Sequence, residues 1–180
     1  MPVSVTLLKG SLTFDGRATV GAFTGMTTQV TAALNLGSPL RTTKGFVEFA
    51  AASLRTNNER RDRDMRQSLE AERYPTIRLD IDGVDLPIDP DHPDARDSLI
   101  GFVTGRLTIH GVTRAVRLPI DIATQGDTLH VRSDFDIDLE EYKIGGLTRM
   151  FGLLKMEPVI RVHANLLFLA KEPLSLQSTP

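Results

Sequence analysis

The sequence contains no cysteine and no tryptophan, and it has only two tyrosines among its 180 residues. Without cysteine, the protein forms no disulfides and binds no metal through thiolates. No stretch approaches the roughly 18 consecutive apolar residues that a transmembrane helix requires. The 21 Lys and Arg residues are outnumbered by 23 Asp and Glu residues, so no basic surplus is available to neutralise a phosphate backbone. We therefore expect neither a transmembrane segment nor a nucleic-acid partner.

The familiar catalytic and targeting motifs are missing as well. There is no Gly-x-Ser-x-Gly elbow, no His-Glu-x-x-His pair and no phosphate-binding loop. The acidic sets that begin at Asp80, Asp89 and Asp136 lack the spacing and central glycine of an EF-hand, so we expect no metal site. The first residues do not form the basic start and long apolar stretch of a signal peptide. We therefore expect a cytoplasmic protein as the sequence stands, and a periplasmic one if a leader has been removed.

Residues 105–120 are typical of a β-hairpin. Apolar and polar residues alternate strictly on both sides of the dipeptide His110-Gly111. Strict alternation indicates strands with one buried and one solvated face. Gly111 supplies the backbone freedom that a tight reversal needs. What the buried face of this hairpin encloses is the functional question.

The same period-two alternation recurs through most of the chain. The other expected strands cover residues 3–14, 17–24, 27–36, 44–54, 76–86, 129–137 and 160–170, and the first hairpin turns at Asp15-Gly16. Residues 57–72 instead carry mixed charges with Met65 and Leu69 four positions apart, which predicts one short amphipathic helix. Eight or nine strands without a βαβ rhythm predict a closed antiparallel barrel or a sandwich, in one domain over residues 1–170 with a flexible tail at 171–180.

The apolar residues on the predicted inner faces are candidates for contact with a bound apolar molecule. This barrel-lining set is Val47, Phe49, Ile77, Leu79, Val103, Leu107, Ile109, Val116, Leu118, Phe135, Ile160, Val162, Leu166 and Phe168.

Four segments of the sequence resemble the YceI-like family of polyisoprenoid-binding, lipocalin-like barrels. They are Ala51-Ala-Ser-Leu-Arg-Thr-Asn-Asn58, Arg61-Asp-Arg-Asp-Met-Arg66, Tyr74-Pro-Thr-Ile77 and Gly105-Arg-Leu-Thr-Ile-His-Gly-Val-Thr113, in the family's order and spacing. The resemblance implies a closed antiparallel eight-stranded lipocalin-like β-barrel with one inserted amphipathic helix, a long apolar tunnel and a homodimer. The residues that match the family motifs, which we interpret as structural, are Arg61, Asp62, Tyr74, Pro75, His110 and Gly111.

The leading hypothesis is a non-catalytic carrier that needs no cofactor and sequesters a long apolar lipid, such as an isoprenoid quinone, a polyisoprenoid or a fatty-acyl lipid. One alternative is an enzyme on a small apolar substrate that uses His110 with Arg61 and Asp62 as acid–base groups. Another is a structural or stress-associated barrel filled by its own side chains. For Arg61 and Asp62 we favour an ion pair that anchors the helix over a gate. The apolar run 150–154, flanked by basic residues, is interpreted as a packed lid, with transient membrane contact as the alternative.

Overall fold

The structure is a computed structural model that describes residues 3–86, 98–145, 148–149 and 154–171. Its strands are β1 (Val3–Ala18), β2 (Gly21–Thr27), β3 (Val30–Leu36), β4 (Lys44–Ala50), β5 (Thr76–Asp85), β6 (Ser98–Ile109), β7 (Val112–Gln125), β8 (Thr128–Asp138), β9 (Thr148–Arg149), β10 (Leu154–Lys155) and β11 (Val159–Ala170). The helices are α1 (Glu59–Ser68) and the 3-10 turns η1 (Leu40–Thr42), η2 (Ala51–Ser53) and η3 (Leu139–Tyr142). The expected tail from residue 172, the acidic loop at 89–94 and residues 150–153 of the apolar run lie outside the described residues.

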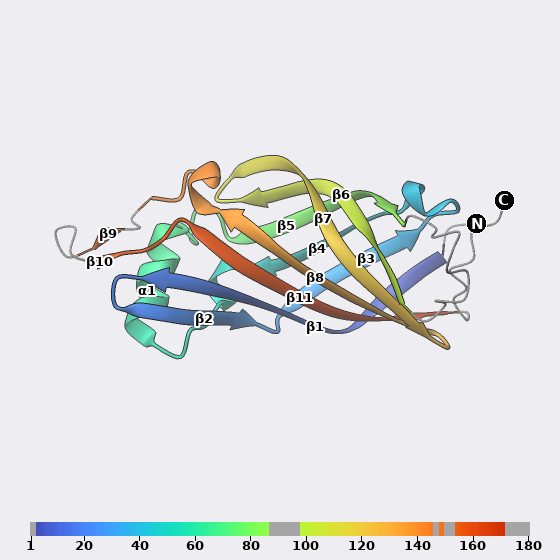
Figure 1. Cartoon of the computed structure of the whole chain (residues 1–180), viewed down its shortest axis with the longest axis horizontal. Helices are drawn as coiled ribbons and strands as arrows, with labels where there is room; N and C mark the ends of the chain where they lie inside the picture. The colour runs from blue at the N-terminus through green and yellow to red at the C-terminus, as the bar shows by residue number, and fades with distance from the viewer. Residues whose placement is uncertain (1–2, 87–97, 146–147, 150–153, 172–180) are drawn as a thin grey trace.

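Nine strands form one antiparallel sheet that closes on itself (Figure 1). Closure comes from β1 and β11, which pair from Val5 opposite Ala170 to Asp15 opposite Arg161. On its other side β1 pairs with β3 near its start and with β2 near its end, so β2 and β3 share one position around the barrel. The result is an eight-stranded barrel, which confirms the predicted fold class.

The interior follows from the alternation in the sequence. Every second residue of β11 points inward, and Ile160, Val162, Leu166 and Phe168 are all buried, the last of them completely. Ala164 continues the same row and is half-buried. Because each strand contributes such a row, the apolar side chains gather inside the barrel and the charged ones remain outside.

Helix α1 lies across one end of the barrel, beside the β1–β2 hairpin (Figure 1). Its N-cap is Asn58, whose side chain accepts a hydrogen bond from the backbone N–H of Arg61 at 3.0 Å. Met65 and Leu69 pack into the core, and the Arg61 guanidinium lies 4.7 Å from the centre of the Phe23 ring on β2. The helix is shorter than the predicted 57–72, because the chain turns after Ser68 and reaches φ +46 at Glu70.

The first hairpin does not turn at Asp15-Gly16 as predicted. Strand β1 continues to Ala18, and the turn falls at Thr19-Val20. Gly16 instead allows the Phe23 ring on the opposite strand to approach the backbone closely, since a Cβ on Gly16 would lie 2.7 Å from that ring. Asp15 faces outward and accepts a hydrogen bond from Thr24 at 2.8 Å. These contacts across the two strands override the turn preference of the dipeptide.

Two further strand predictions need smaller corrections. The predicted strand 27–36 is interrupted after Thr27, and the segment 44–54 leaves the sheet at η2. Ser53 on η2 donates to the Ala50 carbonyl at 2.7 Å and lies 2.8 Å from the Thr27 hydroxyl, and these bonds hold the bend against the end of β2. The hairpin at 105–120 is confirmed, with its turn at His110-Gly111.

Candidate functional site

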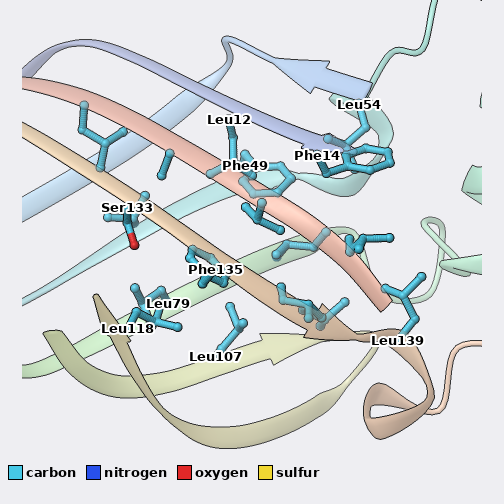
Figure 2. A pocket seen from close by; sticks show the side chains of 18 of the residues that line it. Leu12, Phe14, Phe49, Leu54, Leu79, Leu107, Leu118, Ser133, Phe135 and Leu139 are labelled. Carbon is cyan, nitrogen blue, oxygen red and sulfur yellow. The ribbon is translucent and has the colours of Figure 1, made fainter. Parts of the chain in front are cut away.

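The barrel encloses a cavity of about 680 Å³ that runs along its length (Figure 2). Side chains from every strand of the barrel and from α1 line this cavity. In Figure 2, Leu12, Phe14 and Phe49 face Leu107 and Phe135 across it. Most of its wall is therefore aliphatic and aromatic.

Thirteen of the fourteen residues predicted to line the barrel lie on the cavity wall, from Val47 on β4 to Phe168 on β11. Whether they bind a ligand stays a prediction.

Val116 is the exception, since it is half-buried against both hydrophobic clusters but is not part of the cavity wall. The ladder between β7 and β8 ends where Asp121 pairs with Arg132. Two residues before Asp121 on β7 lies Pro119, which has no N–H to donate, and its carbonyl accepts a hydrogen bond from the Ser133 hydroxyl at 2.6 Å. Strand β7 leaves β8 here, and Val116 is set back from the cavity.

Two hydroxyl groups interrupt the apolar wall away from α1. Thr43 is 1% exposed, and its hydroxyl accepts a hydrogen bond from the backbone N–H of Gly37 at 3.1 Å. Ser133 is buried, and its bond to Pro119 uses its proton but leaves lone pairs on its oxygen. These groups are satisfied by the protein, so the deep part of the cavity presents little polarity to a ligand.

The polar part of the cavity wall lies at the α1 end. It comprises Asn58, Arg60, Arg61, Asp64, Ser68 and Lys155. Val20, at the tip of the β1–β2 hairpin, also lines the cavity and is 77% exposed. At the opposite end the lining residues Leu129 and Phe168 are almost inaccessible. Among the described lining residues, the exposed and polar ones therefore gather at the α1 end, which we call the mouth.

Arg61 and Asp62 hold the helix to the preceding loop, as predicted, but they do so through Thr56 and not through an ion pair with each other. Asp62 accepts hydrogen bonds from the Thr56 N–H at 2.9 Å and from its hydroxyl at 2.6 Å. Arg61 donates to the Thr56 hydroxyl oxygen at 2.9 Å and to its carbonyl at 2.8 Å. Within the described part of the chain no salt bridge joins the two side chains. Only Arg61 reaches the cavity.

His110 lies outside the cavity wall, at the tip of the β6–β7 hairpin. Its Nδ1 donates to the carbonyl of Tyr142 at 3.1 Å, its Nε2 contacts the Glu70 carboxylate, and the Tyr74 ring stacks edge-on at 4.9 Å. His110 thus ties η3 to the turn between α1 and β5. His110, Arg61 and Asp62 do not meet in the cavity, so the acid–base site of the enzyme alternative is not assembled.

Sequence reasoning missed part of the wall. The sequence does indicate that Leu12 and Phe14 face inward, because they lie two positions apart in the first expected strand. Met65 and Leu69, four residues apart on α1, are another. Nothing in the local sequence indicates that Lys155 reaches the mouth, since β10 is brought there by its contact with the β1–β2 hairpin.

The described residues contain no cluster of three or more His, Cys, Asp or Glu side chains that could hold a metal ion. In the same part of the chain, no helix combines the length and apolarity needed to cross a membrane.

A closed antiparallel barrel of eight strands, with an apolar cavity and a helix at one end, defines the lipocalin-like barrels. The model of the YceI-like domain matches residues 6–168, and the chain belongs to the YceI-like family. A search of the curated proteins found no match.

Solved structures share the fold at low sequence identity. BcnA of Burkholderia cenocepacia has a TM-score of 0.71 and 14% identity, with 88% of this chain and 95% of that chain covered. A polyisoprenoid binding domain from Saccharophagus degradans, implicated in plant cell wall breakdown, has a TM-score of 0.69 and 14% identity, with coverages of 93% and 99%. The YCEI protein of Campylobacter jejuni has a TM-score of 0.62 and 21% identity, with coverages of 82% and 84%.

Proposed function

We propose that the protein is a non-catalytic carrier that holds the apolar chain of one lipid molecule inside the barrel. The observation that carries this proposal is the cavity of about 680 Å³ with an apolar wall and a single polar end. Its volume lies within the roughly 300–1,000 Å³ of typical ligand pockets.

The dimensions of the cavity favour one extended chain. The inward row of β11 spans nine residues from Ile160 to Phe168, or about 20 Å along the axis of the tilted barrel. A volume of 680 Å³ over that length gives a channel roughly 6–7 Å wide, whereas carbon atoms in contact lie about 3.5–4.0 Å apart. Such a channel is wide enough for an extended hydrocarbon chain.

Energetics also favour an apolar occupant. At roughly 24 cal/mol per Å³, a dry cavity of this volume would cost on the order of 15 kcal/mol. That is as large as the whole stability of a typical domain, about 5–15 kcal/mol. Water finds few partners here, because the hydroxyls of Thr43 and Ser133 are already bonded within the protein. Each buried methylene of a lipid, by contrast, contributes about 0.8 kcal/mol.

This arrangement and the family both support one class of ligand. An isoprenoid quinone, a polyisoprenoid or a fatty-acyl lipid has one long apolar part and at most one polar end. The Saccharophagus degradans domain is described as polyisoprenoid binding. We propose that the apolar part of the ligand lies along the wall between Phe14 and Phe168, with its polar end at the mouth.

The test is native mass spectrometry of gently purified protein, followed by organic extraction of any bound molecule. Ala164, opposite Ser133 on the cavity wall, allows a blocking variant, Ala164→Trp. The matched control is Ala115→Trp, at an exposed position on β7. We expect a lipid in the wild type and in the control, and its loss from Ala164→Trp. Wild-type protein that is consistently empty and does not take up added lipid would refute the carrier function and favour a ligand-free barrel.

The homodimer expected from the family resemblance stays a prediction, which sedimentation velocity of the purified protein tests.

A further inference from the structure

The mouth of the cavity combines an exposed apolar tip with two cations that have no salt-bridge partner among the described residues. Val20 is 77% exposed, more than any other large apolar residue among those described, yet it also lines the cavity. Lys155 and Arg60 line the cavity as well, and both are exposed. An exposed side chain on the lip of an apolar cavity is placed to contact whatever surface the cavity opens onto.

The tip is held in a defined position. The backbone N–H of Thr19 donates to the Lys155 carbonyl at 2.9 Å, and the Thr19 hydroxyl accepts from the Lys155 N–H at 3.0 Å. Beside them, the N–H of Glu157 donates to the Arg17 carbonyl at 2.8 Å. These bonds fix Val20 outward and place the Lys155 backbone next to it.

The charges at the mouth differ from those on strands β4 to β7 of the barrel wall. On β4 to β7 the cations are paired with carboxylates, as in Lys44–Asp82, Arg78–Glu48 and Arg117–Asp85. Arg60 and Lys155 form no salt bridge with any described residue. Among the described residues that line the cavity, Arg60, Arg61 and Lys155 are cationic and Asp64 alone is acidic. These described lining residues therefore carry a positive surplus at the mouth, although the whole protein has a net charge of -2.

We propose that the mouth docks on an anionic lipid bilayer, with Val20 entering the interface and Arg60 and Lys155 facing the lipid phosphates. This inference rests on the proposed function in one respect, namely that the cargo comes from a membrane. Each lipid methylene that is exposed to water on the way from the bilayer to the barrel lowers the equilibrium population of that exposed state about fourfold. A long chain therefore passes to the barrel only where the barrel contacts the bilayer directly. An apolar tip with flanking cations is suited to such an interface.

The test is co-sedimentation of the protein with vesicles of equimolar phosphatidylglycerol and phosphatidylcholine, compared with vesicles of phosphatidylcholine alone. We expect stronger binding to the anionic vesicles, which weakens as salt is added. Val20→Asp should lower the affinity about tenfold or more, and Arg60→Gln or Lys155→Gln about fivefold each.

Two variants are matched controls. Ile100→Asp places the same charge at a residue that is 72% exposed on β6, opposite Asp121, far from the mouth. Lys9→Gln removes an exposed cation from the barrel wall. Both should bind the anionic vesicles as the wild type does, and circular dichroism should show all variants folded.

Equal binding to both kinds of vesicle, or equal losses in Val20→Asp and Ile100→Asp, would overturn the docking inference. Lipid extracted by the protein after removal of the vesicles is measured in the same samples. Extraction without selective docking would overturn the inference and leave the carrier function intact. Docking without extraction would support the inference and count against the carrier function.

Discussion

The Asp62 carboxylate accepts hydrogen bonds from both the N–H and the hydroxyl of Thr56, at 2.9 and 2.6 Å, and both residues are buried. This contact fixes α1 to the loop before it, and so fixes the helix across the mouth. Asp62→Ala would leave two buried donors of Thr56 without their acceptor. We expect a loss of about 2–4 kcal/mol in the free energy of unfolding, measured by urea denaturation. The exposed helix variant Arg63→Ala should change stability by less than about 0.5 kcal/mol, and an equal effect of the two variants would contradict this role.

Gly111 and Gly126 offer a matched pair of turn positions. Both are in the left-handed region, with φ +71 and +62, but a Cβ on Gly111 would lie 2.5 Å from the Tyr74 ring while a Cβ on Gly126 meets nothing within 4 Å. Gly126→Ala should cost about 1 kcal/mol of backbone strain. Gly111→Ala should cost about 2–4 kcal/mol, because the steric clash adds to that strain. Thermal unfolding of the two variants measures the difference, and equal melting temperatures would refute the proposed packing of the ring.

His163 forms a surface cluster with two carboxylates. Hydrogen bonds to Asp134 and then to Asp15, at 2.5 and 2.9 Å, raise its pKa above the ordinary value of 6.5. A raised pKa in the folded state stabilises the protein below pH 6.5, and the stabilisation is lost as the pH rises through that higher pKa. The hydrogen bonds from His163 and then Thr24 lower the pKa of Asp15 from 3.8, so its contribution is present above pH 3.8 and is lost as the pH falls further.

We therefore expect the wild type to be more stable than His163→Gln at a pH of about 5.5, and this advantage to shrink by a pH of about 8.5. The difference should stay below about 1 kcal/mol, because the His163 side chain is 40% exposed and solvent screens the interaction. Urea denaturation at both pH values measures it. If the stability difference between the wild type and His163→Gln grew with pH, it would contradict the expected direction of the pH dependence.

The inner face of the barrel should not tolerate charge. Leu107 and Phe49 are 7% and 8% exposed and both line the cavity. Leu107→Asp or Phe49→Asp would bury a carboxylate without a partner, so we expect a loss of at least about 3 kcal/mol or failure to fold. Leu8→Asp, at an outward position that is 53% exposed, is the control and should melt close to the wild type. Solubility and thermal unfolding distinguish the three variants.

Much of the strand pattern could be read from the chain. The alternation around Leu107 and the turn at His110-Gly111 depend on neighbours in sequence, and both are confirmed. The predicted turn at Asp15-Gly16 was wrong, because the course of the backbone there depends on contacts with Phe23 and His163. Phe23 lies on the neighbouring strand and His163 near the end of the chain. The position of Val116 could not be predicted from the sequence either, since it depends on where β7 separates from β8.

By itself the sequence determined antiparallel strands with one enclosed apolar face, because period-two alternation repeats over eight strands, and the family resemblance chose a barrel over a sandwich. It also indicated the family and an apolar interior. Only the tertiary structure decided that the mouth of the cavity lies beside α1, that Arg61 reaches the cavity while Asp62 does not, and that Lys155 lies beside Val20. These relationships join residues far apart in the chain, through hydrogen bonds and packing that no local pattern of residues encodes.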